Sequence, residues 1–412
     1  MPTLAVPAAQ LDEPRTWTSQ NAVDPLAPYG RPVTVEYQST IPASIADWQP
    51  ALPAGLAADV TEAEAALATF DQYGFRVLGA DSPTLGPMSS ILLRTESASS
   101  SQIEHLTADA DDLALAELNE ADLDDARSRN ARMVVANVRA MEAALRLADR
   151  LDADAICQMH SELMEEQPQL WNWAGRYRRG LVWIGRSARD GGNPANATYV
   201  APQPELIGDA MEDLAAFLRR SDLPVVAQAA AAHAQFETIH PFVDGNGRTG
   251  RALVHALLRG KGVLRSTTAP ISAGLLRDTE GYFAALTAFR AGDAGPILDA
   301  FARASLYAVR SGTRLVDDLA GHVRTAERNL SGLRSNAAAW RVLPRLVSNP
   351  ILNAALLTKK LGMNDMAAQR ALRQLVDAGV LVERTGRKRN RIYAHTGILA
   401  TLDEYAANLR RS

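Results

Sequence analysis

Apolar side chains recur every three to four residues along most of the chain, which is the period of an amphipathic α-helix. The clearest stripe lies in residues 123–149 and consists of Met133, Val134, Val138, Met141 and Leu145. The same period predicts further helices at residues 57–73, 103–118, 153–165, 204–218, 225–239, 249–261, 280–291 and 295–320. We therefore expect a mainly α fold whose middle part is a helical bundle.

Other segments break the helical period. Residues 180–185 form a short apolar run, a loop rich in glycine and asparagine follows at 190–196, and residues 197–200 form a second short run. This order predicts a β-hairpin inside the helical bundle. Residues 1–45 are expected to be irregular or extended, and residues 81–101 are interpreted as a polar, serine-rich connection.

The C-terminal residues 337–394 predict helices, a tight turn, a further helix and two short strands joined by a basic loop. Gly362 can end one helix and Asn364 can begin the next. The helix at 365–377 would bury Ala368, Ala371, Leu372 and Leu375. It would expose Gln369, Arg370, Arg373 and Gln374. The order resembles a winged helix-turn-helix domain, in which 365–377 is the recognition-type helix.

Charge separates this segment from the rest of the chain. Residues 336–412 hold 13 Lys and Arg against 5 Asp and Glu, a net charge of +8, whereas the remainder carries −12. A basic module on an acidic body favours nucleic acid or an acidic protein as the partner of that module. One interpretation is DNA binding through Arg370, Arg373, Arg387, Lys388 and Arg389. The other is a protein-interaction or dimer module, and a homodimer is left open.

Length and composition restrict the class of protein. A chain of 412 residues predicts two or three domains, and 47% hydrophobic with 22% charged residues is typical of a globular protein. The single cysteine, Cys157, excludes an intramolecular disulfide and fits a reducing compartment. No apolar run approaches the roughly 20 residues that span a membrane, and residues 1–9 lack the basic start of a secretory signal. We expect a cytoplasmic protein with no membrane partner.

The most informative segment is His-Pro-Phe-Val-Asp-Gly-Asn-Gly-Arg-Thr-Gly-Arg at residues 240–251. Gly245 and Gly247 allow a tight turn in which backbone N–H groups converge on an anion, and the helix that follows adds its positive dipole end. Arg248 and Arg251 lie three residues apart, so they share a helix face and suit a polyphosphate. These residue types in this order indicate phosphoryl or nucleotidyl transfer.

Two further side chains of this segment supply the remaining needs of that chemistry. Asp244 can hold Mg²⁺ through one carboxylate, while phosphates and water complete the coordination shell. His240 ends the preceding helix, and an imidazole is a suitable base for a hydroxyl nucleophile at neutral pH. The alternative is a helix corner in which glycine and asparagine cap a helix and the arginines are solvated.

The segment resembles the signature of the Fic family, H-x-F-x-[D/E]-G-N-G-R-x-x-R, at every fixed position. The resemblance implies transfer of AMP from ATP to a hydroxyl of a target protein, with ATP as substrate and Mg²⁺ as cofactor. His240 would deprotonate the target, and Asp244 would hold Mg²⁺ on the α- and β-phosphates. The nucleotide would be bound by Gly245, Asn246, Gly247, Arg248, Thr249, Gly250 and Arg251.

The same resemblance assigns a regulatory segment. Ser100 to Glu104 is similar to the inhibitory motif of the family, [S/T]-x-x-x-E-[G/N], with His105 where the family has Gly or Asn. Ser100 would be the N-cap of a helix, and Glu104 in its first turn would take Arg251 from the γ-phosphate. The alternative is a capping serine beside a solvated glutamate. A further option is that Glu104 orients water for removal of AMP.

Two more contacts follow from the resemblance. The hairpin at 181–200 would lie over the site as a flap that pairs with an extended target segment, with Val182 or Ile184 as clamps. The alternative is a hairpin that packs Trp183 on the bundle. Tyr282 and Phe283 would flank the adenine, with core packing as an equal alternative.

These features predict three parts: an N-terminal arm and helical region at 1–130, a Fic catalytic core at 131–325 and a winged helix at 326–412. The first hypothesis is a protein adenylyltransferase restrained by Glu104, with an unknown target protein and self-modification. The second is a DNA-binding regulator that uses its Fic domain as a nucleotide sensor. A third hypothesis keeps the transferase activity but replaces ATP with another donor, either a different nucleotide or a phosphocholine-like group.

Overall fold

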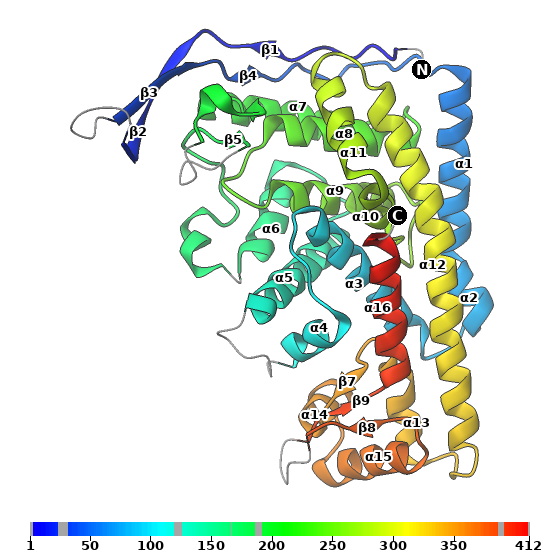
Figure 1. Ribbon diagram of the computed structural model, residues 1–412. Coiled ribbons are helices and arrows are strands. Elements are labelled where there is room, and N and C mark those ends of the chain that lie inside the picture. The colour runs from blue at the N-terminus through cyan, green and yellow to red at the C-terminus, as the bar shows by residue number, and fades with distance from the viewer. Residues whose placement is uncertain are drawn as a thin grey trace. The chain divides into compact units, whose positions relative to one another are not determined.

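The computed structural model describes residues 3–23, 32–118, 126–165, 167–185, 192–385 and 391–410, and the fold is mainly helical, as predicted (Figure 1). The described residues form two compact units. Unit 1 comprises Met1–Thr61, Ala143–Gly260 and Glu280–Ala302, and unit 2 comprises Glu62–Glu142, Lys261–Thr279 and Arg303–Ser412. The three-part division made from the sequence stays a prediction.

Unit 1 is built around helix α8 (Val225–Ile239), which is buried at every position after Val225. Most of its residues are alanine or another apolar type, and a helix that is apolar on all sides belongs in a core. Helices α7 (Ile207–Arg219) and α9 (Asn246–Gly260) pack on α8, and α6 (Ala153–Met164) packs on both of them. The α8 helix has the bounds that the sequence predicted.

Short strands complete unit 1. The predicted hairpin is confirmed, because β5 (Trp183–Ile184) pairs antiparallel with β6 (Tyr199–Val200). The extended N-terminal region forms two further pairs, β1 (Gln10–Leu11) with β4 (Thr40–Ile41) and β2 (Arg15–Val23) with β3 (Pro32–Tyr37). The ring of Trp17 meets the ring of Trp183 edge-on at 5.5 Å, so part of the β5 side chain surface is used within unit 1.

Unit 2 contains the principal departure from the predicted elements. Helix α3 (Leu85–Ile103) runs through the segment interpreted as a connection, and the helix expected at 103–118 is the shorter α4 (Ala110–Glu117). The serines of α3 are buried although they are polar: Ser97, Ser99, Ser100 and Ser101. Small side chains allow close packing, and Asn137 donates to the carbonyl of Ser97 and the hydroxyl of Ser101.

The remaining helices of the chain follow the apolar period. They are α1 (Ala54–Asp71), α2 (Tyr73–Leu78), α5 (Ala126–Arg146), α10 (Ile271–Leu275), α11 (Thr279–Arg290) and α12 (Gly295–Leu330). Helix α5 carries the apolar stripe from Met133 to Leu145, and α12 is ten residues longer than predicted. Among the described helices none is both long enough and apolar enough to cross a membrane.

The C-terminal elements of unit 2 are α13 (Ala338–Val342), β7 (Ile351–Leu352), α14 (Ala354–Leu361), α15 (Asp365–Asp377), β8 (Val382–Glu383), β9 (Tyr393–Ala394) and α16 (Thr396–Arg410). The strands form an antiparallel sheet in the order β7-β9-β8. Gly362 ends α14 with φ +60°, and Asn364 caps α15 by accepting from Ala367 N–H at 2.8 Å. Helix α15 buries the four apolar residues that the sequence indicated.

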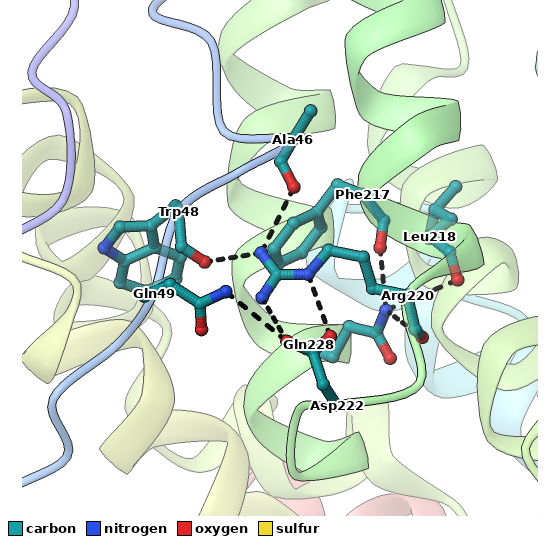
Figure 2. A network of polar contacts seen from close by, with 8 residues as sticks. All are labelled: Ala46, Trp48, Gln49, Phe217, Leu218, Arg220, Asp222 and Gln228. Atoms are coloured by element: carbon teal, nitrogen blue, oxygen red, sulfur yellow. Dashed lines mark hydrogen bonds and ion pairs between the residues drawn. The ribbon is translucent and has the colours of Figure 1, made fainter.

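A polar network in unit 1 holds the end of α7 (Figure 2). The Gln228 amide donates to the carbonyls of Phe217, Leu218 and Arg220 at 2.8, 3.3 and 3.1 Å. These carbonyls lie at a helix C-terminus, where the helix itself provides no donors. The Arg220 guanidinium in turn donates to the carbonyls of Ala46 and Trp48 (Figure 2).

We predict that Gln228→Ala lowers the free energy of unfolding by about 1–3 kcal/mol, because buried carbonyls lose their donor. Urea denaturation followed by far-UV circular dichroism measures this. Gln49→Ala is the matched control, since Gln49 is exposed and makes one long contact with Asp222 in the same network. Its expected effect is below about 0.5 kcal/mol. Equal effects of the two substitutions would contradict the structural role of Gln228.

Candidate active site

His240 lies directly after α8 in a left-handed backbone conformation, with φ +48° and ψ +61°. Its N–H donates to the carbonyl of Phe236 at 2.8 Å, which closes the helix. This conformation costs a residue with a β-carbon about 1–2 kcal/mol, so the surrounding contacts must hold it. The turn directs the imidazole back to the last turn of α8, where Nδ1 lies 3.7 Å from Oε2 of Glu237.

Donors from three elements cap the C-terminal end of α8. The Arg290 guanidinium donates to the carbonyl of Glu237 at 3.3 Å, the Tyr199 hydroxyl donates to Thr238, and the Arg178 guanidinium donates to His240 at 2.8 Å. Cations are favourable at this end of a helix because the dipole is negative there. The turn that carries His240 is thus fixed from several sides.

Arg178 makes four hydrogen bonds to backbone carbonyls in this part of unit 1, although sequence reasoning did not identify it. Besides His240, its guanidinium donates to the carbonyls of Gly180 at 3.0 Å and Pro202 at 2.7 Å, and its own N–H donates to Pro241. The residue is 1% exposed, and burial lowers the pKa of its side chain to about 10. One buried cation therefore joins the His240 turn to both ends of the β5–β6 hairpin.

The loop after His240 is closed by a reciprocal pair of hydrogen bonds. The Asn246 side chain accepts from Phe242 N–H at 2.9 Å and donates to the Phe242 carbonyl at 2.9 Å. The Phe242 ring is fully buried and stacks on His160 with 3.7 Å between ring centroids. Asn246 and Phe242 therefore set the shape of the loop.

His160, from α6, supports the same loop and was also missed. Its Nδ1 accepts from Gly175 N–H at 3.0 Å, so Nε2 carries the proton and donates to the carbonyl of Asp244 at 3.0 Å. Burial lowers the pKa of His160 to about 4, which keeps the ring neutral at physiological pH. A lone histidine on an apolar helix carries no signal from which this role could be read.

The backbone at Gly245 leads the chain into α9. Gly245 has φ +76°, and a β-carbon there would lie 2.7 Å from Cε of Met164 and 2.9 Å from Cδ2 of Leu163. The first backbone bond of α9 runs from Thr249 N–H to the Gly245 carbonyl. The amides of residues 245–247 precede that bond, and such N–H groups at a helix N-terminus suit a phosphate.

The two motif arginines are buried, so the interpretation of a solvated pair is wrong. Nη2 of Arg248 lies 3.4 Å from Oδ2 of Asp244, whose side chain is 47% exposed. Arg251 lies close enough to Glu237 to help lower its pKa. Arg248 thus lies beside the half-exposed carboxylate of Asp244, and Arg251 lies near the buried carboxylate of Glu237.

This arrangement fits a magnesium ion that has only one protein carboxylate as a ligand. Within the described ranges, no three His, Cys, Asp or Glu side chains gather in a group that could bind a metal by themselves. Mg²⁺ commonly uses one or two carboxylates together with substrate phosphates and water. The exposed oxygens of Asp244 are suited to that mode.

Two family models match this chain, and together they contain the segments 240–251 and 100–104. Residues 150–258 match the Fic/DOC family, and residues 57–146 match the Fic/DOC family N-terminal region. The chain belongs to the Fic family. The His240–Arg251 segment lies within the range that matches the Fic/DOC family, and Ser100–Glu104 lies within the range that matches its N-terminal region.

Known relatives share part of the chain. Protein adenylyltransferase fic-1 of Caenorhabditis elegans is 30% identical over 152 residues, which are 36% of this chain and 26% of that protein. A probable protein adenylyltransferase of Aquifex aeolicus (strain VF5) is 34% identical over 91 residues, 22% of this chain and 26% of that protein. The chain thus spans about a quarter of the length of these relatives.

One solved structure is similar over most of the chain. The crystal structure of a Fic family protein from Desulfovibrio desulfuricans G20 gives a TM-score of 0.51 at 22% identity. The match covers 85% of this chain and 99% of the other. At this identity the likeness shows a shared fold.

The other nucleotide residues expected from the Fic resemblance differ in their exposure. Thr249 and Gly250 are buried, and a β-carbon at Gly250 would lie 2.9 Å from the Phe236 ring. Tyr282 is buried, and its hydroxyl lies 2.7 Å from Nε2 of His233, whereas Phe283 is 48% exposed. Contacts with the nucleotide stay predictions for all four, and for adenine only Phe283 offers an exposed ring.

The hairpin residues Val182 and Ile184 use their backbone carbonyls within the hairpin itself. The carbonyls of Val182 and Ile184 accept from Ala201 and Thr198 within the hairpin, at 3.0 and 2.8 Å. Their backbone oxygens are thus used inside the β5–β6 pair, and Ile184 exposes 38% of its surface. Pairing with a target segment stays a prediction.

The helical position expected for the inhibitory motif is wrong. Ser100 is buried in the last turn of α3 and does not cap a helix start, and Glu104 follows the end of that helix. Sequence reasoning placed a helix start here because it interpreted the buried serines as a loop. His105 has φ +61°, a left-handed conformation that glycine and asparagine adopt readily, which explains why the family motif has them at this position.

The residues proposed for DNA contact divide into two groups. Arg370 and Arg373 are exposed on α15, as expected. Arg387, Lys388 and Arg389 lie outside the described residues.

We predict that Gly245→Ala destabilises the protein more than Gly362→Ala does. Both residues have a positive φ, which costs alanine about 1–2 kcal/mol. A β-carbon at Gly362 has nothing within 4 Å, whereas at Gly245 it overlaps two side chains of α6, and overpacking adds about 1–3 kcal/mol. Thermal unfolding of both variants measures the difference. Equal losses of stability in the two variants would show that the side chains of α6 move to make room for the β-carbon without destabilising the protein.

Proposed function

We propose that this chain is a protein adenylyltransferase that transfers AMP from ATP to a Ser, Thr or Tyr hydroxyl of a target protein. The observation that carries the proposal is the complete Fic motif, held in a shape that presents a histidine, a carboxylate and two buried arginines together. The relatives from Caenorhabditis elegans and Aquifex aeolicus are named as a protein adenylyltransferase and a probable one, which agrees with this activity. The match to them covers only part of their length, so the activity remains a proposal.

The proposed reaction assigns one role to each group. His240 takes the proton of the target hydroxyl at Nε2 while the hydroxyl oxygen bonds to the α-phosphorus of ATP. The bond from the α-phosphorus to the bridging oxygen breaks, and pyrophosphate leaves with the electron pair. Arg248 and Arg251 hold the β- and γ-phosphates, and the amides of residues 245–247 cradle phosphate oxygens. A magnesium ion at Asp244 would neutralise negative charge on the α- and β-phosphates.

We further propose that Glu104 restrains this activity. The Fic resemblance implies that its carboxylate competes with the γ-phosphate for Arg251, so that ATP binds with the α-phosphate turned away from attack. The helix end observed at Glu104 and the left-handed turn at His105 support an inhibitory motif. Removal of AMP, with Glu104 orienting water, is an alternative direction of the same chemistry.

We predict that Glu104→Gly raises self-modification from α-labelled ATP at least tenfold, and that His240→Asn in this background lowers it about 100-fold or more. Asparagine tolerates the left-handed conformation at residue 240 but cannot act as a base, so the turn is kept while the proton acceptor is lost. Incorporation of label into the purified chain measures both effects. Transfer that survives His240→Asn would contradict the mechanism. If Glu104→Gly does not raise transfer, the proposal that Glu104 inhibits the enzyme is wrong.

A second function concerns the C-terminal elements. We propose that α13 to β9 form a winged helix that binds DNA, so that the Fic domain could also serve a transcriptional regulator as a nucleotide sensor. The observations in favour are the α14–α15 pair joined by a tight turn, the antiparallel sheet and the exposed Arg370 and Arg373 on α15. The alternative use of the module is protein interaction or dimerisation.

We predict that the full chain binds duplex DNA and that Arg370→Ala with Arg373→Ala weakens binding at least tenfold, because two cations near phosphates are lost. Fluorescence anisotropy at two salt concentrations measures it. Lys359→Ala with Lys360→Ala is a charge-matched control on α14. Equal loss in both pairs would indicate general attraction to charge, and no binding by the parent chain would favour protein interaction.

A further inference from the structure

The last turn of α8 contains a buried carboxylate that the reaction above does not use. The Glu237 side chain is 7% exposed, and its Oε2 lies 3.7 Å from Nδ1 of His240. Within the described part of the chain, neither Oε1 of Glu237 nor Nδ1 of His240 has a hydrogen-bond partner. A carboxylate and an imidazole nitrogen thus face each other where little of either side chain is exposed.

The charges around Glu237 favour its ionised form. Burial raises the pKa of a carboxyl group, but interactions with His240, His233 and Arg251 outweigh burial and hold the pKa of Glu237 at about 2. Arg290 donates to the backbone carbonyl of Glu237, and the Tyr199 hydroxyl lies near enough to interact electrostatically with the carboxylate. Glu237 therefore keeps its negative charge over the whole pH range in which the enzyme works.

Packing leaves this carboxylate little freedom. A β-carbon at Gly250 would lie 3.0 Å from Oε1 of Glu237 and 2.9 Å from the ring of Phe236, so the α9 backbone passes directly beside the carboxylate. The capped turn at the end of α8 fixes His240 on the other side. Both partners are thus held by their backbones, and the 3.7 Å gap is small enough to close when substrate binds, as hydrogen bonds in active sites often do.

We propose that Glu237 is the positioning residue of His240: it holds Nδ1 of the imidazole and so directs Nε2 toward the target hydroxyl. This inference rests on the proposed function, because it concerns the base of that reaction. With the proton on Nδ1 facing the carboxylate, the lone pair of Nε2 is the one that can accept the hydroxyl proton. Once that proton has moved, the imidazolium cation is stabilised by the negative charge of Glu237 until the proton leaves to solvent or pyrophosphate.

The test uses Glu237→Gln in the Glu104→Gly full-length chain. Glutamine keeps the size of the side chain and removes its charge, so a change in rate reports the charge. We expect the rate of self-modification at saturating ATP to fall about 100-fold, the KM for ATP to stay within about threefold, and the acid limb of the pH–rate profile to move to lower pH by about one unit. Without the anion, the imidazole loses its proton more readily, which sets the direction of that shift.

Two further variants separate charge from structure. Glu237→Asp keeps the charge on a shorter side chain. We expect its rate to be at least tenfold higher than that of Glu237→Gln, and the acid limb of its pH–rate profile to lie where it does in the parent chain. Gln228→Ala removes a buried structural contact elsewhere on α8 and is expected to leave the acid limb in place. A destabilised fold alone would lower the amount of active enzyme without moving the profile.

A measurement that needs no turnover complements these rates. The ¹⁵N shifts of the His240 ring are expected to show the Nδ1-protonated tautomer in the chain with Glu237 and a mixture of tautomers after Glu237→Gln. An unchanged tautomer and an unchanged pH profile in the glutamine variant would overturn the inference. If His240→Asn also retained transfer, the proposed function itself would fail; if His240→Asn is inactive while Glu237→Gln behaves as its parent, only the role of Glu237 is lost.

Discussion

The buried guanidinium of Arg178 is the interaction on which the arrangement of the site depends. It binds the carbonyls of His240, Gly180 and Pro202, and so joins the end of the central helix to both ends of the hairpin. No single neutral donor could reach all of these groups in the fork geometry that arginine provides. The cost of burying the cation is offset by charge-assisted hydrogen bonds to the carbonyl of His240 at a helix terminus and to the carbonyls of Gly180 and Pro202 beside the hairpin.

The rest of the site follows from the same need to hold an irregular backbone. A left-handed histidine, a glycine with positive φ and a loop that returns into a helix are each unfavourable alone. Phe242 and Asn246 close the loop from within, and His160 supports it from α6. These contacts hold the charged groups near one another before substrate arrives, which is the condition for electrostatic catalysis.

The sequence predicted the helical class, the β5–β6 hairpin, and the bounds of α8 and α15. Helix α15 has a clear apolar period, α8 is apolar on all sides, and the hairpin consists of two short apolar runs around a loop rich in glycine and asparagine. The sequence also located the motif, whose residues are adjacent in the chain. It could not identify Arg178 or His160, because each donates to backbone carbonyls that are far away in the sequence: Arg178 to His240 and Pro202, and His160 to Asp244. It misplaced the start of the helix near Ser100, because buried serines have the composition of a loop although α3 packs them in a core.

We propose that this site transfers the AMP part of ATP and not its terminal phosphate. The most direct measurement incubates the Glu104→Gly chain with ATP labelled either at the α-phosphate or at the γ-phosphate and follows label on protein. We predict that α-label is incorporated and γ-label is not, because pyrophosphate leaves. Incorporation of γ-label, or of neither label while ATP is bound, would contradict it.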